Sequence, residues 1–191
     1  MKHLLWILPA LLLLGSCAWF YNNSRANTET PNYKVTQTDG AFELREYPDL
    51  KLAKTGMVSD ADGSFMRLFG YISGKNEREE KIAMTTPVFI DRSTGAGSMS
   101  FIVPKAVEAK GAPKPKADAV KVEAWKGGKL AVHRFDGSAR GKNEAEAVQK
   151  LRAWCSDQKL TTEGEPVFAY YDPPWTPSFL RRSEVMIRVV P

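Results

Sequence analysis

The chain contains one pattern twice, and this duplication restricts its possible folds more than any other feature. Residues 42–57 and 120–135 each alternate apolar and polar side chains on both sides of a short break, which is the pattern of a β-hairpin. An amphipathic stretch with apolar residues at helical spacing follows each of them, at 64–73 and at 142–157. Because one such unit cannot bury the apolar face of its own helix, the sequence predicts that the two units join their sheets.

Each half then continues with the tripeptide Pro-Val-Phe, which begins at Pro87 in the first half and at Pro166 in the second. A proline within an apolar run is typical of a strand that bends or lies at an edge, so residues 81–90 are predicted to form a kinked strand. The last strands of the halves are expected over 99–103 and 184–189. The predicted fold is therefore α+β, a distorted and mostly antiparallel β-barrel built from two pseudo-symmetric ββαββ-like repeats with two packed helices.

The predicted repeats cover about 33–104 and 120–191, and together they have the length of a single domain, 33–191. The connector between them, 105–119, is rich in lysine, alanine and proline. One interpretation is a solvated linker that proline keeps extended. The alternative is a basic lip that meets the carboxylates of a bound ligand.

The N-terminus has the features of an export signal. Residues 1–16 begin with Lys2 and continue as an apolar run that is shorter than the roughly 20 residues of a membrane-spanning helix. The tetrapeptide Leu14-Gly-Ser-Cys17 resembles a bacterial lipobox, which implies a lipoprotein signal peptide over 1–16 and lipidation of Cys17. The polar segment 17–32 would then tether the domain to the bacterial cell envelope, at the periplasmic face of the outer or inner membrane. The alternatives are an uncleaved anchor and an ordinary signal peptide.

Charge and reactive residues argue against several functional classes. The formal net charge is +5, which falls to +4 once the signal peptide and its single lysine are removed, and this mild excess does not favour a nucleic-acid partner. Beyond Cys17 only Cys155 remains, so no internal disulfide is expected. His133 is the only histidine after the signal peptide, which leaves no two-histidine metal site. No catalytic residue is predicted, and the chain is not expected to be an enzyme.

Two motifs carry a resemblance to a known family. They are Tyr71-Ile-Ser-Gly-Lys-Asn, which precedes the 81–90 stretch, and Tyr171-Asp-Pro-Pro-Trp-Thr-Pro, which is followed by Arg181-Arg182-Ser-Glu-Val. With them the sequence resembles the SOUL haem-binding protein family from Tyr33 onward. The resemblance implies a carrier, buffer or sensor that binds haem or a related tetrapyrrole without a covalent link, beside the first helix. The alternatives are a binding module for another flat hydrophobic small molecule, a hydrolase acting on such a ligand, and a structural envelope protein.

The candidate haem site is the wall that the first helix forms with the strand after it. Haem needs a flat apolar slot for its ring and cations near its propionates. The slot residues that carry over by resemblance are Phe65, Leu68, Phe69, Ile72 and Met84. The same side chains would also serve as hydrophobic core without any ligand.

Arginines supply the predicted cations at the edge of this slot, because a guanidinium group can pair with both oxygens of a carboxylate. Arg67 lies on the first helix and Arg181 in the C-terminal motif, and Lys75 and Arg182 are further candidates. Arg182 has an alternative structural role, in which it forms a salt bridge with Glu184 beside the last strand.

His133 is the only histidine after the signal peptide and is therefore the candidate histidine ligand for a haem iron. In an alternating strand it shares a face with Ala131 and Phe135, where it is either a ligand or a hydrogen-bonded core residue. Met66 and Met84 are weaker candidate ligands. The family resemblance implies that haem can bind without a histidine, and binding of that kind predicts modest affinity.

The C-terminal motif holds two large aromatic residues, Trp175 and Phe179, within a proline-rich segment. One hypothesis is a lid over the mouth of the pocket. The other is a segment that packs the C-terminus across the end of the barrel.

Overall fold

The computed structural model describes residues 28–58, 63–93, 97–135, 142–173 and 175–191. They form an α+β fold with a mostly antiparallel nine-stranded sheet and three helices. The strands are β1 (Lys34–Asp39), β2 (Phe42–Tyr47), β3 (Leu50–Gly56), β4 (Val88–Asp91), β5 (Ser98–Ile102), β6 (Val120–Trp125), β7 (Gly128–Phe135), β8 (Thr161–Tyr170) and β9 (Ser183–Val190). The helices are α2 (Ser64–Ile72), α3 (Lys105–Ala109) and α4 (Lys142–Asp157), and a 3₁₀ turn, η1, spans Ser178–Leu180.

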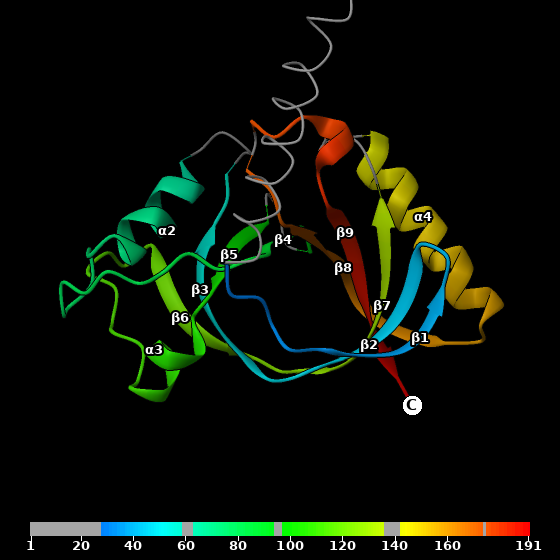
Figure 1. Ribbon diagram of the computed structural model, residues 1–191, viewed down its shortest axis with the longest axis horizontal. Coiled ribbons are helices and arrows are strands. Elements are labelled where there is room, and N and C mark those ends of the chain that lie inside the picture. The colour runs from blue at the N-terminus through cyan, green and yellow to red at the C-terminus, as the bar shows by residue number, and fades with distance from the viewer. Residues whose placement is uncertain (1–27, 59–62, 94–96, 136–141, 174) are drawn as a thin grey trace, which may run out of the picture.

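The sheet is open, so the predicted closed barrel is not formed. Its strand order is β1-β2-β7-β9-β8-β4-β5-β3-β6, with β1 and β6 as its two edges. Figure 1 shows a strongly curved sheet with α2 and α4 on opposite sides of the molecule. The curvature gives the sheet a barrel-like shape although its edge strands do not pair with each other in the described structure.

The two predicted hairpins are also absent from the described strands, because β2 pairs with β7 and β3 pairs with β6. In this pairing Tyr47 lies opposite Gly128, and Leu50 lies opposite Trp125. A two-residue hairpin turn needs a positive φ at its first central position, and Pro48 cannot adopt that angle. The first half therefore continues from β2 into β3 and pairs along its length with the second half.

The links between these strands cross in direct contact. Gly127 lies against the link of the first half, where an added Cβ would come within 2.3 Å of the Tyr47 carbonyl oxygen. The Gly127 amide donates to Asp49 Oδ1 at 2.7 Å, and its carbonyl accepts from Arg188 Nη1 at 2.7 Å. Only glycine fits at this crossing without displacing the neighbouring backbone, so a single position helps to hold the two halves together.

Each longer helix covers its own part of the sheet. Helix α4 contacts β7, β8 and β9, whereas α2 contacts β3, β5 and β6. Along β7, Ala131 and Phe135 belong to the hydrophobic cluster beneath α4, while Leu130 and Val132 belong to a central cluster. Because neighbouring strand residues point to opposite faces, this central cluster lies on the face turned away from α4.

The predicted helices agree closely with the observed ones, since 64–73 contains α2 and 142–157 matches α4. Helix α2 ends at a Ser73 cap followed by Gly74, whose φ of 110° suits glycine. On α4, Cys155 is a free and buried thiol, and burial raises its pKa. The recurrence of apolar residues at i, i+3 and i+4 was sufficient to locate both helices.

Two local predictions were wrong. The kinked strand over 81–90 is shorter than expected, because β4 begins only at Val88, after the proline that cannot donate a ladder hydrogen bond. The connector 105–119 is not entirely a loop, since it begins with helix α3.

The predicted signal peptide, Cys17 and the tether up to residue 27 lie outside the described residues. Among the helices of the described ranges, none combines the length and the apolar character that crossing a bilayer requires.

Candidate functional site

Helix α2 has apolar side chains on two faces. Leu68 and Ile72 are buried in the cluster beneath the helix, together with Tyr71, which is 1% exposed. Phe65 and Phe69, predicted to point the same way, are 43% and 44% exposed. The single predicted stripe is therefore divided, because Tyr71 takes a sheet-facing position and turns the two phenylalanines toward the surface.

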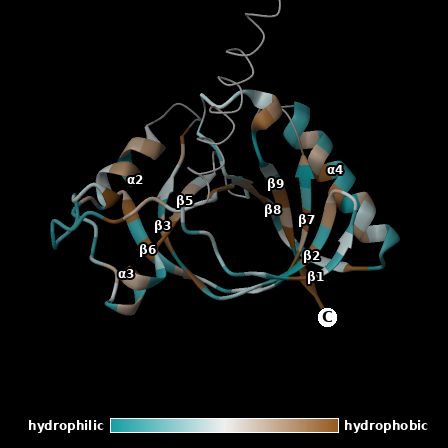
Figure 2. Ribbon diagram, in the orientation of Figure 1, coloured by the Kyte–Doolittle hydropathy of each residue, from teal (hydrophilic) through white to brown (hydrophobic). Residues whose placement is uncertain are grey.

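The exposed aromatic residues form a small apolar surface on α2. Phe65 and Phe69 stack with ring centroids 6.1 Å apart, and Phe65 also contacts Phe101 edge-on at 5.3 Å. Met66, in the same turn, is 63% exposed. Figure 2 shows hydrophobic colouring over much of α2, whereas hydrophilic and hydrophobic residues are interspersed along α4. Exposed apolar side chains gathered in one place are typical of a binding surface.

Met66 also lines a pocket of about 250 Å³, which is called the α2 pocket below. Its lining residues are Gly63, Met66, Arg67, Tyr71, Lys75, Pro115, Ala117 and Val120. The first five come from α2 and its flanking residues, and the others come from the connector and the start of β6. The pocket thus joins two segments that are at least 40 residues apart in the sequence.

The connector is fixed against α2 by hydrogen bonds. The Tyr71 hydroxyl donates to the Pro113 carbonyl at 2.9 Å, and the Lys116 amide donates to the Lys75 carbonyl at 3.1 Å. Asn76 is fully buried, and its side chain donates to the carbonyls of Tyr71 and Glu80. These contacts explain the Tyr71–Asn76 motif, because its two terminal residues shape the loop on which the connector lies.

Two cationic residues line the α2 pocket. Arg67 Nε donates to Thr55 Oγ1 at 3.1 Å, and its Nη2 donates to the Gly56 carbonyl at 2.7 Å, which holds the guanidinium against the end of β3. The stem of Lys75 lies against Gly70, where an added Cβ would come within 3.1 Å of Lys75 Cδ. The pocket therefore combines apolar walls with two positive charges.

The structure brings few of the predicted haem residues together in one cavity. Arg67 lines the α2 pocket, and Phe65 and Phe69 lie on the adjoining surface. Leu68 and Ile72 belong to the core beneath the helix, and Met84 packs partly buried against the same core. Arg181 does not line the α2 pocket, and its Nε donates to the Thr176 carbonyl at 2.6 Å.

His133 lies in the other half, beneath α4. It is 6% exposed and stacks on Phe42 at 4.3 Å, and Phe42 in turn stacks on Trp154 at 5.3 Å. Burial lowers the pKa of His133, and the nearby charge of Lys150 lowers it further, against a raising contribution from the Ala41 carbonyl. The described residues contain no group of three or more His, Cys, Asp and Glu side chains that could hold a metal ion.

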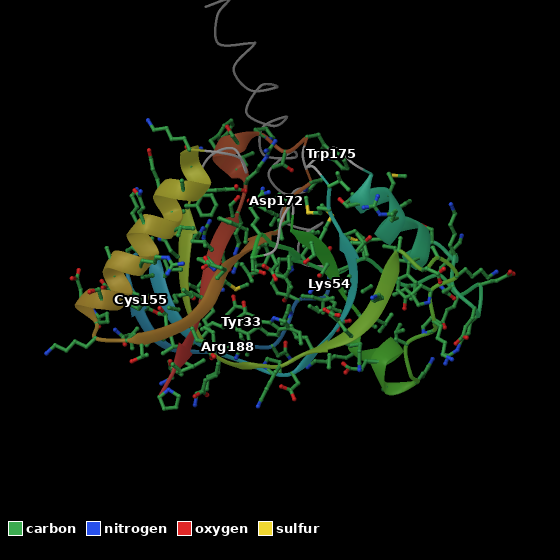
Figure 3. All side chains as sticks on the ribbon, turned by 180° about the vertical axis from the view of Figure 1, so that it is seen from behind. Tyr33, Lys54, Cys155, Asp172, Trp175 and Arg188 are labelled. Atoms are coloured by element: carbon green, nitrogen blue, oxygen red, sulfur yellow. The ribbon has the colours of Figure 1, made fainter. Side chains whose placement is uncertain are left out.

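The C-terminal motif forms the loop between β8 and β9. Asp172 Oδ2 accepts from the Arg182 amide at 2.6 Å, so the two ends of the loop are held together. Trp175 and Phe179 are 82% and 79% exposed, and Figure 3 shows Trp175 at the edge of the molecule, away from Tyr33. Their exposure supports neither a closed lid nor a packed C-terminal segment.

A buried polar network links side chains of β2 and β9 across the intervening strand β7. Glu184 is 0% exposed, and its carboxylate pairs with Arg45 at 2.7 Å and with Arg182 at 2.8 Å. Burial would raise the pKa of Glu184, but hydrogen bonds and charges from both arginines outweigh it, so the pKa lies below its ordinary value of 4.5. Burial is also the main reason that the pKa of Tyr47 rises to about 12. The proposed structural pair of Arg182 with Glu184 is thus present.

Sequence reasoning missed most of the pocket lining. Met66, Arg67 and Lys75 were considered, and the connector was considered as a basic lip. Pro115, Ala117 and Val120 were not named as apolar wall residues, because nothing local in the sequence indicates that the connector lies on α2. Arg45 was missed as well, since an arginine in an alternating strand usually faces solvent.

The fold places the chain among proteins with a curved sheet flanked by helices. It is similar to the C-terminal domain of EcmrR, with a TM-score of 0.55, 12% identity, and coverage of 83% of this chain and 98% of that one. It is also similar to a hydrolase from Listeria innocua, with a TM-score of 0.56, 11% identity, and coverage of 81% and 94%. At these identities the likeness concerns the fold alone.

Sequence comparison identifies the family. The model of the SOUL heme-binding protein family matches residues 28–188. Heme-binding protein 2 from Homo sapiens is 30% identical over 163 residues, which cover 76% of this chain and 79% of that protein. The chain belongs to the SOUL heme-binding protein family, as its two motifs indicated.

Proposed function

We propose that this chain binds haem or a related tetrapyrrole reversibly, in the α2 pocket and on the apolar surface beside it. The observation that carries the proposal is the exposure of Phe65, Met66 and Phe69 next to a pocket that Arg67 and Lys75 also line. Apolar side chains suit the ring, and the two cations suit its propionates. Membership of a family described as heme-binding supports the same ligand.

The size of the pocket limits how the ligand is held. Pockets that enclose a small ligand usually measure roughly 300–1,000 Å³, whereas the α2 pocket measures about 250 Å³. A macrocycle would therefore enter by one edge, and the rest of its ring would lie across Met66 toward Phe69. Partial enclosure favours modest affinity and rapid exchange, which suit a carrier, buffer or sensor.

Met66 is the side chain best placed for axial ligation in this proposal. It is 63% exposed and lines the α2 pocket, so its thioether is accessible from the side on which the ring would lie. His133 is buried beneath α4. A single thioether is a weak ligand, in keeping with reversible binding.

A haemin titration of the full chain in lipid nanodiscs tests the proposal, with empty nanodiscs as the reference. We expect a saturable change in the Soret band at one haemin per chain. Met66→Gln should lower the affinity and shift the band, and His133→Ala should leave the spectrum unchanged. Binding that depends on His133 but not on Met66 would contradict the assignment. Saturable binding of unrelated flat apolar molecules without porphyrin binding would favour the alternative ligand class.

We further propose that the chain is a lipoprotein of the bacterial cell envelope, anchored through Cys17 at the periplasmic face of the outer or inner membrane. The lipobox-like Leu14-Gly-Ser-Cys17 and the polar segment 17–32 support this. The described fold takes up the chain at Glu29, whose carbonyl accepts from the Thr86 amide at 3.0 Å. Mass spectrometry should find lipid on Cys17, and Cys17→Ser should leave the membrane fraction. An unmodified Cys17 in the mature chain would contradict the anchor.

We also propose that the domain is a duplicated unit. Without β1, the strand order is symmetric about the boundary between β8 and β4. The equivalent strands are β2 and β6, β7 and β3, and β9 and β5. Relatives whose two halves share no equivalent sequence positions would contradict a duplication.

A further inference from the structure

A second pocket, distinct from the α2 pocket, lies in the other half of the molecule and measures about 300 Å³. It is called the arginine pocket here. Its lining residues are Tyr33, Val35, Gly40, Ala41, Glu43, Arg45, Arg134, Arg182 and Glu184. They come from β1 with the residue before it, from β2 and the turn between these strands, from β7, and from β9 with the residue before it. Most of this lining is polar or charged, unlike the lining of the α2 pocket.

The sheet register places the charged side chains on one face. Arg134 on β7 is directly opposite Glu184 on β9, and Glu43 on β2 is directly opposite Val132 on β7. Residues directly opposite each other in an antiparallel pair point to the same face. Arg45 follows two residues after Glu43, so it shares that face.

Glu184 is already saturated with hydrogen bonds. Its Oε1 accepts from Arg45 Nη2 at 3.0 Å and from Arg182 Nε at 2.9 Å. Its Oε2 accepts from Arg45 Nη1 at 2.7 Å and from the Tyr171 hydroxyl at 3.0 Å. A carboxylate has about four acceptor sites, so Glu184 has none left for Arg134 or for a cationic ligand.

The remaining hydrogen-bonding capacity of the pocket is mainly that of donor groups. Three guanidinium groups against two carboxylates leave one positive charge in excess. Within the described residues, no hydrogen bond or ion pair engages the Arg134 side chain. The Tyr33 hydroxyl accepts from Arg182 Nη2 at 3.0 Å and keeps its own proton to donate. Arg45, which is 3% exposed, is held rigidly by its carboxylate partners.

We propose that the arginine pocket binds a small oxyanion, a carboxylate or a phosphate, with Arg134 as its principal charged contact. A guanidinium group presents two parallel N–H donors that match the oxygens of such an anion. The buried network fixes the floor of the pocket, and Arg134 supplies the uncompensated charge. This site goes beyond the proposed haem function, since it shares no lining residue with the α2 pocket.

Isothermal titration of the full chain in nanodiscs tests the proposal, with inorganic phosphate in one series and succinate in another, at constant ionic strength. We expect saturable binding of at least one of them. The anion that binds more tightly shows whether the pocket prefers a phosphate or a carboxylate. Arg134→Gln should weaken binding about tenfold or more. Arg134→Lys should keep part of the affinity, because it keeps the charge and loses the two-pronged contact.

Lys129→Gln is the matched control, because Lys129 is exposed at the other end of β7, outside the pocket, and its loss removes the same charge. It should bind like the wild type. No saturable binding of either anion, or equal weakening by Arg134→Gln and Lys129→Gln, would overturn the proposal. Haemin binding at the α2 pocket should survive Arg134→Gln, so failure here is distinguishable from failure of the haem function.

Discussion

The two longer helices cover comparable parts of one sheet, yet they use their apolar residues differently. Helix α4 buries Ala147, Leu151, Trp154 and Cys155 and leaves polar side chains on its outer face. Helix α2 buries Leu68, Tyr71 and Ile72 and still exposes Phe65, Met66 and Phe69. The sixteen-residue helix is thus closed against the sheet, whereas the nine-residue helix has apolar side chains in excess of what its core needs.

This difference distinguishes a structural helix from a candidate binding helix in one fold. Trp154 is anchored under α4 by a hydrogen bond from Nε1 to Asp39 Oδ2 at 2.8 Å, so even its polar atom is satisfied within the protein. On α2 the rings of Phe65 and Phe69 stack on each other, and Phe101 is the only other ring that they contact among the described residues. Apolar surface that the fold does not bury is available to a ligand.

The largest expected effect is a loss of stability in the part of the fold that α4 covers. Leu151 is 0% exposed, so Leu151→Ala should lower the free energy of unfolding by about 2–5 kcal/mol, because it removes buried methyl groups and leaves a cavity. Denaturant unfolding measures the loss. Phe69→Ala, at a 44% exposed position, should cost clearly less. Equal losses would show that both helices serve as core, and the comparison would fail.

The next effect concerns ligand binding on the exposed apolar surface of α2. Phe69→Ser should weaken haemin binding about tenfold, since it removes apolar surface worth roughly 1–2 kcal/mol to a bound ring. The Soret titration measures this change. Gln149→Ser, at an exposed position of α4, is the control and should leave the affinity unchanged. A loss with the control variant as large as with Phe69→Ser would place the site elsewhere.

A smaller effect is expected from the charge beside the pocket. Lys75→Gln should weaken haemin binding about threefold, because a solvent-screened ion pair contributes only about 0–1 kcal/mol. The difference between the variant and the wild type should shrink in high salt. A salt-independent difference would indicate that Lys75 acts through packing on Gly70 and not through its charge.

The smallest effect is a pH dependence of stability that arises from His133, beneath α4. The pKa of folded His133 lies below its ordinary value of 6.5, chiefly because of burial, so the unfolded chain binds this proton more readily. Its contribution to stability is complete above pH 6.5 and is lost as the pH falls through the folded pKa. His133→Gln should remove this part of the pH profile of unfolding. An unchanged profile would assign the dependence to other groups.

Most of the secondary structure could be predicted because it depends on local periodicity. The spacing of Leu151, Trp154 and Cys155 indicated α4, and alternation indicated the strands of both halves. The family could also be predicted, since its motifs are contiguous in the sequence. The sequence predicted that α2 borders the candidate site. It did not predict which face of α2 packs on the sheet.

The sequence alone thus determined the order of elements, the family and the helix on which a ligand site is proposed, because residues that are neighbours in the chain decide periodicity and motifs. Only the tertiary structure decided that β2 pairs with β7 and not with β3, that Tyr71 and not Phe69 faces the core, and that Pro115 and Arg45 line pockets. These outcomes depend on contacts between residues far apart in the chain. Packing of such distant segments selects among pairings and helix rotations that are locally almost equivalent.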